Sequence, residues 1–152
     1  MRIFKFKCLT LSALALLGAC GEEAQPVLNV NGEWHVQHGF YEQCEVNASF
    51  NAEQITLTFI SLEEDACLPE LFGLQDDYLI MTIDSREDGF ADDGALMATF
   101  HVTATELATS GSLVFTESET GMTGSITDVD QFSDEIETLT AFDYPMIRIQ
   151  SD

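Results

Sequence analysis

The sequence predicts an all-β fold, either a single antiparallel β-barrel or a sandwich of about eight strands with one or two short helices. Three observations lead to this prediction. From Val27 onward, apolar and polar residues alternate with a period of two, which is typical of half-buried antiparallel strands. The alternating runs are rich in Thr, β-branched and aromatic residues, which favour strands. Short clusters of Gly, Asp, Ser and Thr separate the runs and predict turns.

The most regular predicted strands are runs whose apolar side chains share one face. In residues 55–60, Ile55, Leu57 and Phe59 lie on one face and two threonines on the other. The same alternation gives three further apolar faces: Leu96, Ala98, Phe100 and Val102; Leu113 and Phe115; and Met122, Gly124 and Ile126. Further strands are expected from Gly32, at residues 78–83 and at residues 146–150.

Turns are predicted at residues 61–65, 84–94, 109–112, 118–121 and 143–145. Helical signals are limited to two segments. Ser61 and Glu64 have the spacing of a capping box, and Pro69 would end a helix there after about two turns. Residues 130–142 are consistent with a helix in their first part and with a strand in their last part, so both alternatives stay open.

The first 20 residues follow the three-part pattern of a secretory signal. A basic segment precedes an apolar stretch at residues 9–17, which is too short to span a bilayer because a spanning helix needs roughly 20 residues. The segment Leu17-Gly18-Ala19-Cys20 then resembles the bacterial lipobox. That resemblance implies cleavage before Cys20 and attachment of a lipid to its thiol.

The expected organisation follows from this resemblance. Residues 1–19 form a lipoprotein signal peptide, residues 20–26 the lipidated cysteine and a short polar tether, and residues 27–152 the β domain. The lipid would anchor the protein in the cell envelope. Gly21 follows the cysteine where an aspartate would resemble the inner-membrane retention signal, so we expect the outer rather than the inner membrane.

Cleavage would also change the charge of the protein. It removes three of the five basic residues and leaves Arg86 and Arg148 against 27 acidic residues, a formal net charge of −25. Nucleic acid and anionic lipid headgroups bind through Lys and Arg, so the composition argues against both as partners. Cations, basic partners, or an acidic surface that only keeps the protein in solution remain as interpretations.

The cysteines predict one disulfide. Cys8 leaves with the signal peptide and Cys20 carries the lipid, which leaves Cys44 and Cys67 as an even pair. In an oxidising envelope compartment such a pair is expected to form a bridge. A metal-binding or catalytic thiol is the alternative, but the chain has no Cys-x-x-Cys motif.

The segment Gly32-Glu33-Trp34 opens the first strand of the domain. It resembles the Gly-x-Trp signature of lipocalin-type barrels, although no second motif of that family is present and no family is assigned. The resemblance implies a barrel that can hold one small apolar ligand, with Trp34 at its base and Arg148 packed over the tryptophan ring. The alternative is that Trp34 is an ordinary core aromatic.

The loop at residues 84–94 is the segment richest in acidic residues and glycine. Arg86 stands where an EF-hand needs its third ligand, and no Glu follows at the twelfth position, so the loop is not an EF-hand. A looser Ca²⁺ site formed by Asp88, Asp92 and Asp93 is one interpretation. A solvated hairpin tip is the other.

Motifs of catalysis are absent from the sequence, which has no Gly-x-Ser-x-Gly, no His-Glu-x-x-His and no phosphate-binding loop. We therefore expect no enzymatic activity and no obligatory cofactor. The leading functional prediction is an envelope protein with an interaction or accessory role. The alternatives are a lipocalin-like barrel for an apolar ligand and a surface-binding module stabilised by Ca²⁺.

Overall fold

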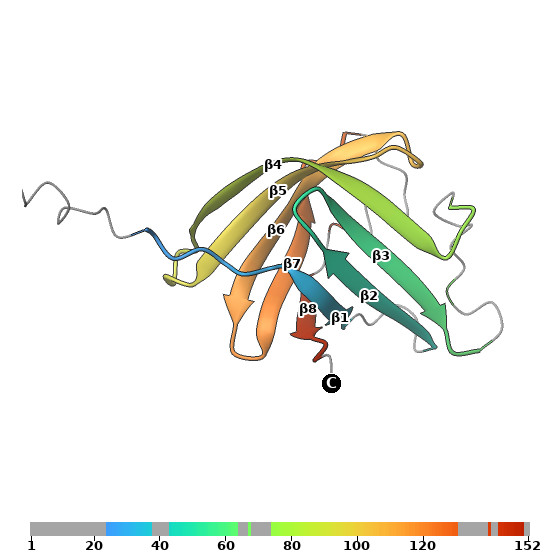
Figure 1. Ribbon diagram of the computed structural model, residues 1–152, viewed down its shortest axis with the longest axis horizontal. Helices are drawn as coiled ribbons and strands as arrows, with labels where there is room; N and C mark the ends of the chain where they lie inside the picture. The colour runs from blue at the N-terminus through green and yellow to red at the C-terminus, as the bar shows by residue number, and fades with distance from the viewer. Residues whose placement is uncertain are drawn as a thin grey trace, which may run out of the picture.

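The computed structural model describes residues 24–37, 43–63, 67, 74–130, 140 and 143–150. The all-β prediction is confirmed, because the described chain forms a closed antiparallel barrel (Figure 1). Its strands are β1 (Gly32–Val36), β2 (Cys44–Phe50), β3 (Gln54–Ser61), β4 (Tyr78–Phe90), β5 (Leu96–Ala104), β6 (Thr109–Ser118), β7 (Gly121–Thr127) and β8 (Asp143–Arg148). No helix among the described residues is long and apolar enough to cross a membrane.

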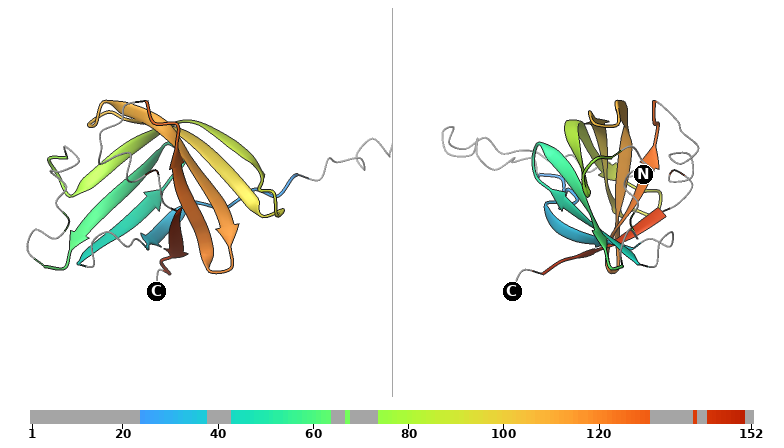
Figure 2. Two further views of the ribbon diagram at one scale, coloured as in Figure 1. Left: turned by 180° about the vertical axis from the view of Figure 1, so that it is seen from behind. Right: turned by 90° about the vertical axis from the view of Figure 1, so that its right-hand side faces the viewer.

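The barrel has the simplest possible topology. Each strand pairs with the next one in the chain, and β1 closes the sheet by pairing with β8, where Trp34 lies opposite Arg148 (Figures 1 and 2). This pairing decides between the barrel and the sandwich that the sequence left open. Closure also leaves none of the eight strands with an unpaired edge.

The inner face of the barrel carries the apolar residues that alternation predicted. Ile55 and Phe100 are almost completely buried, and their strand neighbours on the same face follow the predicted period of two. The buried residues form one continuous cluster, to which all eight strands contribute. The strands therefore enclose a single interior, and anything bound inside the protein has to share that space.

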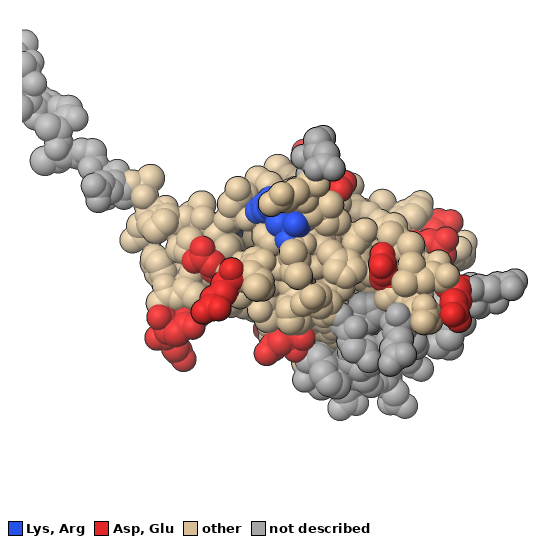
Figure 3. Space-filling view, turned by 90° about the horizontal axis from the view of Figure 1, so that it is seen from below, with Lys and Arg blue, Asp and Glu red and all other residues tan. Residues whose placement is uncertain are grey.

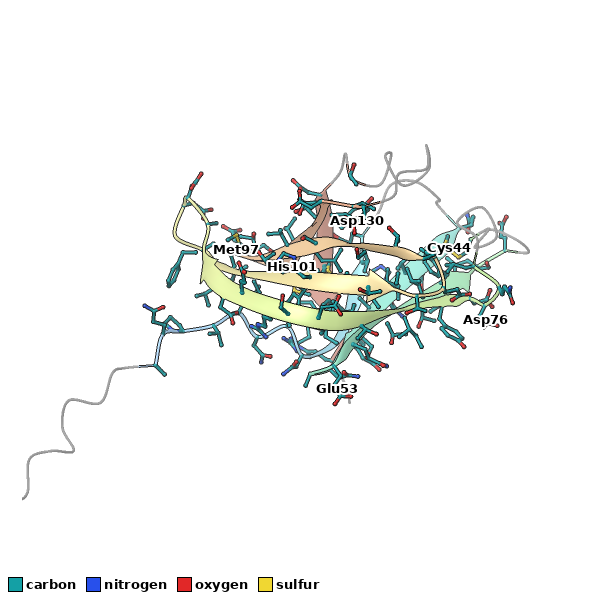
Figure 4. All side chains as sticks on the ribbon, turned by 90° about the horizontal axis from the view of Figure 1, so that it is seen from above. Cys44, Glu53, Asp76, Met97, His101 and Asp130 are labelled. Carbon is teal, nitrogen blue, oxygen red and sulfur yellow. A yellow bond between two sulfur atoms is a disulfide. The ribbon has the colours of Figure 1, made fainter. Side chains whose placement is uncertain are left out.

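The two ends of the barrel differ. At one end the strands are joined by short connections at residues 51–53, 91–95 and 119–120. At the other end lie the connections 37–43, 62–77, 105–108 and 128–142. We call these the tryptophan end and the cavity end, respectively, after the features described below. Figure 4 shows Cys44 and Asp76 together at the cavity end and Met97 towards the opposite end.

Several predicted turns are wrong. Residues 109–112 and 143–145 belong to β6 and β8, and β4 continues to Phe90 instead of ending near Asp84. The turn before β6 lies at residues 105–108, where Ala108 has a φ of 50° although the segment contains no glycine or proline. β2 was not predicted as a strand. The two segments with helical signals lie largely outside the described residues, and Ser61 ends β3.

Candidate functional site

A cavity of about 240 Å³ lies inside the barrel at the cavity end. All eight strands contribute to its wall. The lining is mostly aliphatic and aromatic, and it includes Val36, Val46, Leu57, Phe59, Leu79, Met81, Val102, Ala104, Leu113, Ile126 and Met146. An apolar wall of this kind favours apolar guests, because water beside it finds few polar partners.

Aromatic rings form the floor of the cavity. Phe50 and Phe115 both line it and meet edge to face, with their ring centroids 5.1 Å apart. Phe100 lies behind them, with centroid distances of 6.4 Å to Phe50 and 5.8 Å to Phe115. Trp34 and Arg148, which the sequence predicted as possible ligand-cavity residues, are not among the lining residues. The ring cluster separates them from the cavity.

Two hydroxyl groups occupy register positions on the inner face beside the cavity. Thr109 lies opposite buried Ala104 and lines the cavity, yet its Oγ1 is buried and has no hydrogen-bond partner among the described residues. Tyr144 also lines the cavity, and burial raises its pKa to about 12. Its phenol therefore stays neutral at physiological pH, and the wall carries no charge at this position.

The Cys44–Cys67 disulfide is confirmed and borders the cavity. Its Cα atoms lie 4.9 Å apart, and both residues are buried. Ser61 Oγ accepts a hydrogen bond from the backbone N–H of Cys67 over 3.1 Å. The bridge thus fixes one point of the 62–77 connection to the start of β2, next to the apolar wall.

Trp34 and Arg148 form the base that the sequence predicted, at the tryptophan end. The guanidinium of Arg148 lies 4.2 Å from the centroid of the Trp34 ring, and Trp34 Nε1 donates a hydrogen bond to the carbonyl of Val30 over 2.8 Å. Gly32 has a φ of +108°, and a Cβ there would lie 3.0 Å from Arg148 Nη1. A Cβ at Gly121 would clash with the Met146 carbonyl oxygen and would lie 3.1 Å from the Trp34 ring, so the ring fits only against glycine.

Two arginines, Arg86 and Arg148, hold the chain segment before β1 against the tryptophan end of the barrel. They are the only Lys or Arg residues after Lys7 in the sequence. Arg148 donates to the carbonyls of Asn29 and Asn31 over 2.7 and 2.6 Å. Arg86 donates to the carbonyl of Leu28 over 2.7 Å and lies 5.2 Å from the Phe100 ring centroid. Figure 3 shows basic atoms in one small patch on this face, with acidic residues around it. The guanidinium groups of Arg86 and Arg148 are therefore both bound at the tryptophan end, opposite the cavity.

The predicted Ca²⁺ ligands are not gathered into a site. Asp88 forms an ion pair with Arg86 at 2.6 Å, and Asp93 Oδ1 accepts the backbone N–H of Ala95 over 3.0 Å. Asp88 lies in β4, whereas Asp92 and Asp93 lie in the turn that follows it. The described residues contain no group of three or more His, Cys, Asp or Glu side chains arranged to hold a metal.

Sequence reasoning did not locate the cavity or Thr109. The alternation of apolar residues shows which side chains face inward, but it does not show whether they fill the interior. Thr109 was placed in a turn because Thr, Ser and Gly cluster at 109–112. Its inward position follows only from the pairing of Thr109 with Ala104. Cys20, the predicted lipidation site, lies outside the described residues.

Comparisons with protein families, with curated proteins and with solved structures give no match. The fold and the site thus define a class, a small closed antiparallel barrel with an apolar cavity at one end, and any function has to be argued from the cavity itself.

Proposed function

We propose that this protein binds one small apolar ligand in its barrel cavity and acts by binding, without catalysis. The observation that carries the proposal is the cavity of about 240 Å³ with its largely apolar lining. Transfer of apolar surface from water into such a space is favourable by roughly 25 cal/mol per Å² buried. A well-formed apolar cavity with few polar groups is the usual setting of a small-molecule site.

The cavity supports ligand binding more strongly than it supports an interaction or accessory role, which is the leading functional prediction from the sequence. A domain that serves only as an interaction module has no need of an unfilled interior, because interiors pack at close to crystal density and a void costs stability. Here the strands leave space between the Phe50 and Phe115 rings and the Cys44–Cys67 bridge. A bound ligand would recover the packing that this space lacks.

The tryptophan end supports the same proposal. The contact of Arg148 with Trp34, beside Gly32 with its positive φ, is the arrangement that the Gly-x-Trp resemblance to lipocalin-type barrels implies. Such a base closes one end of the barrel rigidly and leaves the other end for the ligand. The resemblance concerns this base and the strand order, and the proposal does not depend on common ancestry.

Filling the cavity tests the proposal. Ala104 is buried and lines the cavity, so Ala104→Leu is expected to lower the affinity for toluene at least roughly tenfold by occupying the space, with little loss of stability. Thr99→Leu adds similar bulk on the outer face of the same strand, between the inward-facing Ala98 and Phe100, and should leave the affinity unchanged. Calorimetric titration with toluene measures both. Wild-type protein that takes up neither toluene nor octan-1-ol contradicts the proposal.

We further propose that the barrel is anchored through a lipid on Cys20, as the lipobox resemblance implies. Residues 24–27 are exposed and lead into the tryptophan end, so a tether there would leave the cavity end facing away from the membrane. The Cys20→Ser variant is expected to move from the membrane fraction to the soluble fraction. An unchanged membrane fraction would contradict the anchor and would leave the proposed ligand binding untouched.

A further inference from the structure

Resting on the proposed ligand binding, we propose that the cavity selects an uncharged amphiphile with one hydroxyl or carbonyl group, which hydrogen-bonds to Thr109 Oγ1, and rejects the anionic counterpart. Three features of the structure lead to this inference: an unpartnered hydroxyl at the cavity wall, the distribution of charge between the two ends of the barrel, and the size and polarity gradient of the cavity.

The hydroxyl of Thr109 is the first feature. Its Oγ1 is buried, and it has no hydrogen-bond partner among the described residues. Buried polar atoms are nearly always paired, since an unpaired one loses its hydration without compensation. By contrast, the nearby Ser112 hydroxyl is paired, with His101 Nδ1 at 2.9 Å. In the present rotamer other atoms of Thr109 line the cavity and the Oγ1 is covered, so a rotation about χ1 would present the hydroxyl to a ligand as both donor and acceptor.

The position of Thr109 gives the ligand a direction. Thr109 is the first residue of β6, next to the connection 105–108 at the cavity end. The Phe50 and Phe115 rings lie at the opposite side of the cavity and offer only apolar contacts. An amphiphile would thus place its polar group at Thr109 and its hydrocarbon part towards the rings.

The charge distribution is the second feature. The four connections at the cavity end contain no Lys or Arg, and His38 is their only residue able to carry a positive charge. Exposed carboxylates lie there instead, among them Glu63, Asp76, Asp77, Glu106, Asp128 and Asp130. Both described arginines sit at the tryptophan end, bound to backbone carbonyls. A carboxylate ligand would approach against like charge and would meet no cationic side chain among the described residues that line the cavity, where an unpaired charge is costly.

The volume limits the length of the ligand. A cavity of about 240 Å³ lies just below the roughly 300–1,000 Å³ of typical small-molecule pockets, so the proposed ligand is one short chain or a single ring. Octan-1-ol and octanoate are therefore suitable probes, because they share the chain length and differ in the charge of the head group.

The experiment titrates the protein at neutral pH with toluene, octan-1-ol and octanoate. Octan-1-ol is expected to bind more than about tenfold tighter than octanoate, because the cavity supplies no counter-charge. Thr109→Val keeps the shape of the side chain and removes its hydroxyl. This variant should bind octan-1-ol roughly fivefold more weakly and toluene with unchanged affinity. Thr109→Ser keeps a hydroxyl and should retain the affinity for octan-1-ol.

The probes separate the two proposals. If toluene binds and octanoate matches octan-1-ol, the inference about head-group selection is overturned and the binding function stands. The same holds if Thr109→Val binds octan-1-ol as tightly as the wild type does. If neither toluene nor octan-1-ol binds, the proposed function itself fails. The comparison of octan-1-ol with octanoate uses only the wild type, so it decides even if a Thr109 variant does not fold.

Discussion

Replacing Trp34 with alanine is expected to lower the free energy of unfolding by about 3–5 kcal/mol, the range for truncating a large buried aromatic side chain. Trp34 is only 3% exposed and lies beneath Gly121, where no other residue fits against its ring. The substitution also removes the cation–π contact with Arg148 and the donor to the Val30 carbonyl. Losing all three at once loosens the segment before β1.

The Trp34→Phe variant separates packing from hydrogen bonding. Phenylalanine keeps most of the apolar contact but leaves the Val30 carbonyl without its donor, so we expect a loss of about 1–3 kcal/mol. Urea denaturation followed by circular dichroism measures both variants, because Trp34 is the only tryptophan and its fluorescence disappears with it. A Trp34→Ala variant within about 1 kcal/mol of the wild type would contradict the assigned role of the base.

Removing the Cys44–Cys67 disulfide is expected to lower the free energy of unfolding by about 3 kcal/mol, because the bridge restricts the unfolded chain. The bridge spans a sequence separation of 23 and ties the 62–77 connection to β2 beside the cavity. We expect Cys44→Ala combined with Cys67→Ala to reduce the affinity for toluene as well, because both cysteines line the cavity.

Chemical reduction of the disulfide is the control for this prediction. Dithiothreitol should destabilise the wild type by a similar amount and leave the doubly substituted protein unchanged, as judged by the urea midpoint. A wild-type midpoint that does not move on full reduction would show that the bridge contributes nothing to stability. Thiol titration of the unfolded protein verifies that reduction is complete.

The fold was largely predictable from the sequence because its signals are local. The alternation of Ile55, Leu57 and Phe59 reports directly on which side of a strand each residue faces, and the inner face of the barrel follows it. The cysteine pair and the contact of Arg148 with Trp34 were also predictable, since only two cysteines and two arginines follow residue 20.

The remaining features depend on distant parts of the chain. Closure requires β1 to meet β8, and Arg148 donates to Asn31 across a sequence separation of 117. Whether inward side chains fill the interior depends on how all eight strands pack, which no single segment encodes. The turn at 105–108 was missed because Ala108 adopts a positive φ without a glycine to signal it, and this shifted Thr109 from β6 into a predicted turn.

The native mass of the protein, purified gently without chelator, tests the central claim most directly. We predict extra mass from a single small organic molecule that is lost on denaturation, or that appears once the protein is soaked with octan-1-ol. The Ala104→Leu variant should carry none. A wild-type protein that stays bare after soaking, or whose extra mass is that of a metal ion alone, would contradict the claim that the cavity is a site for an apolar ligand.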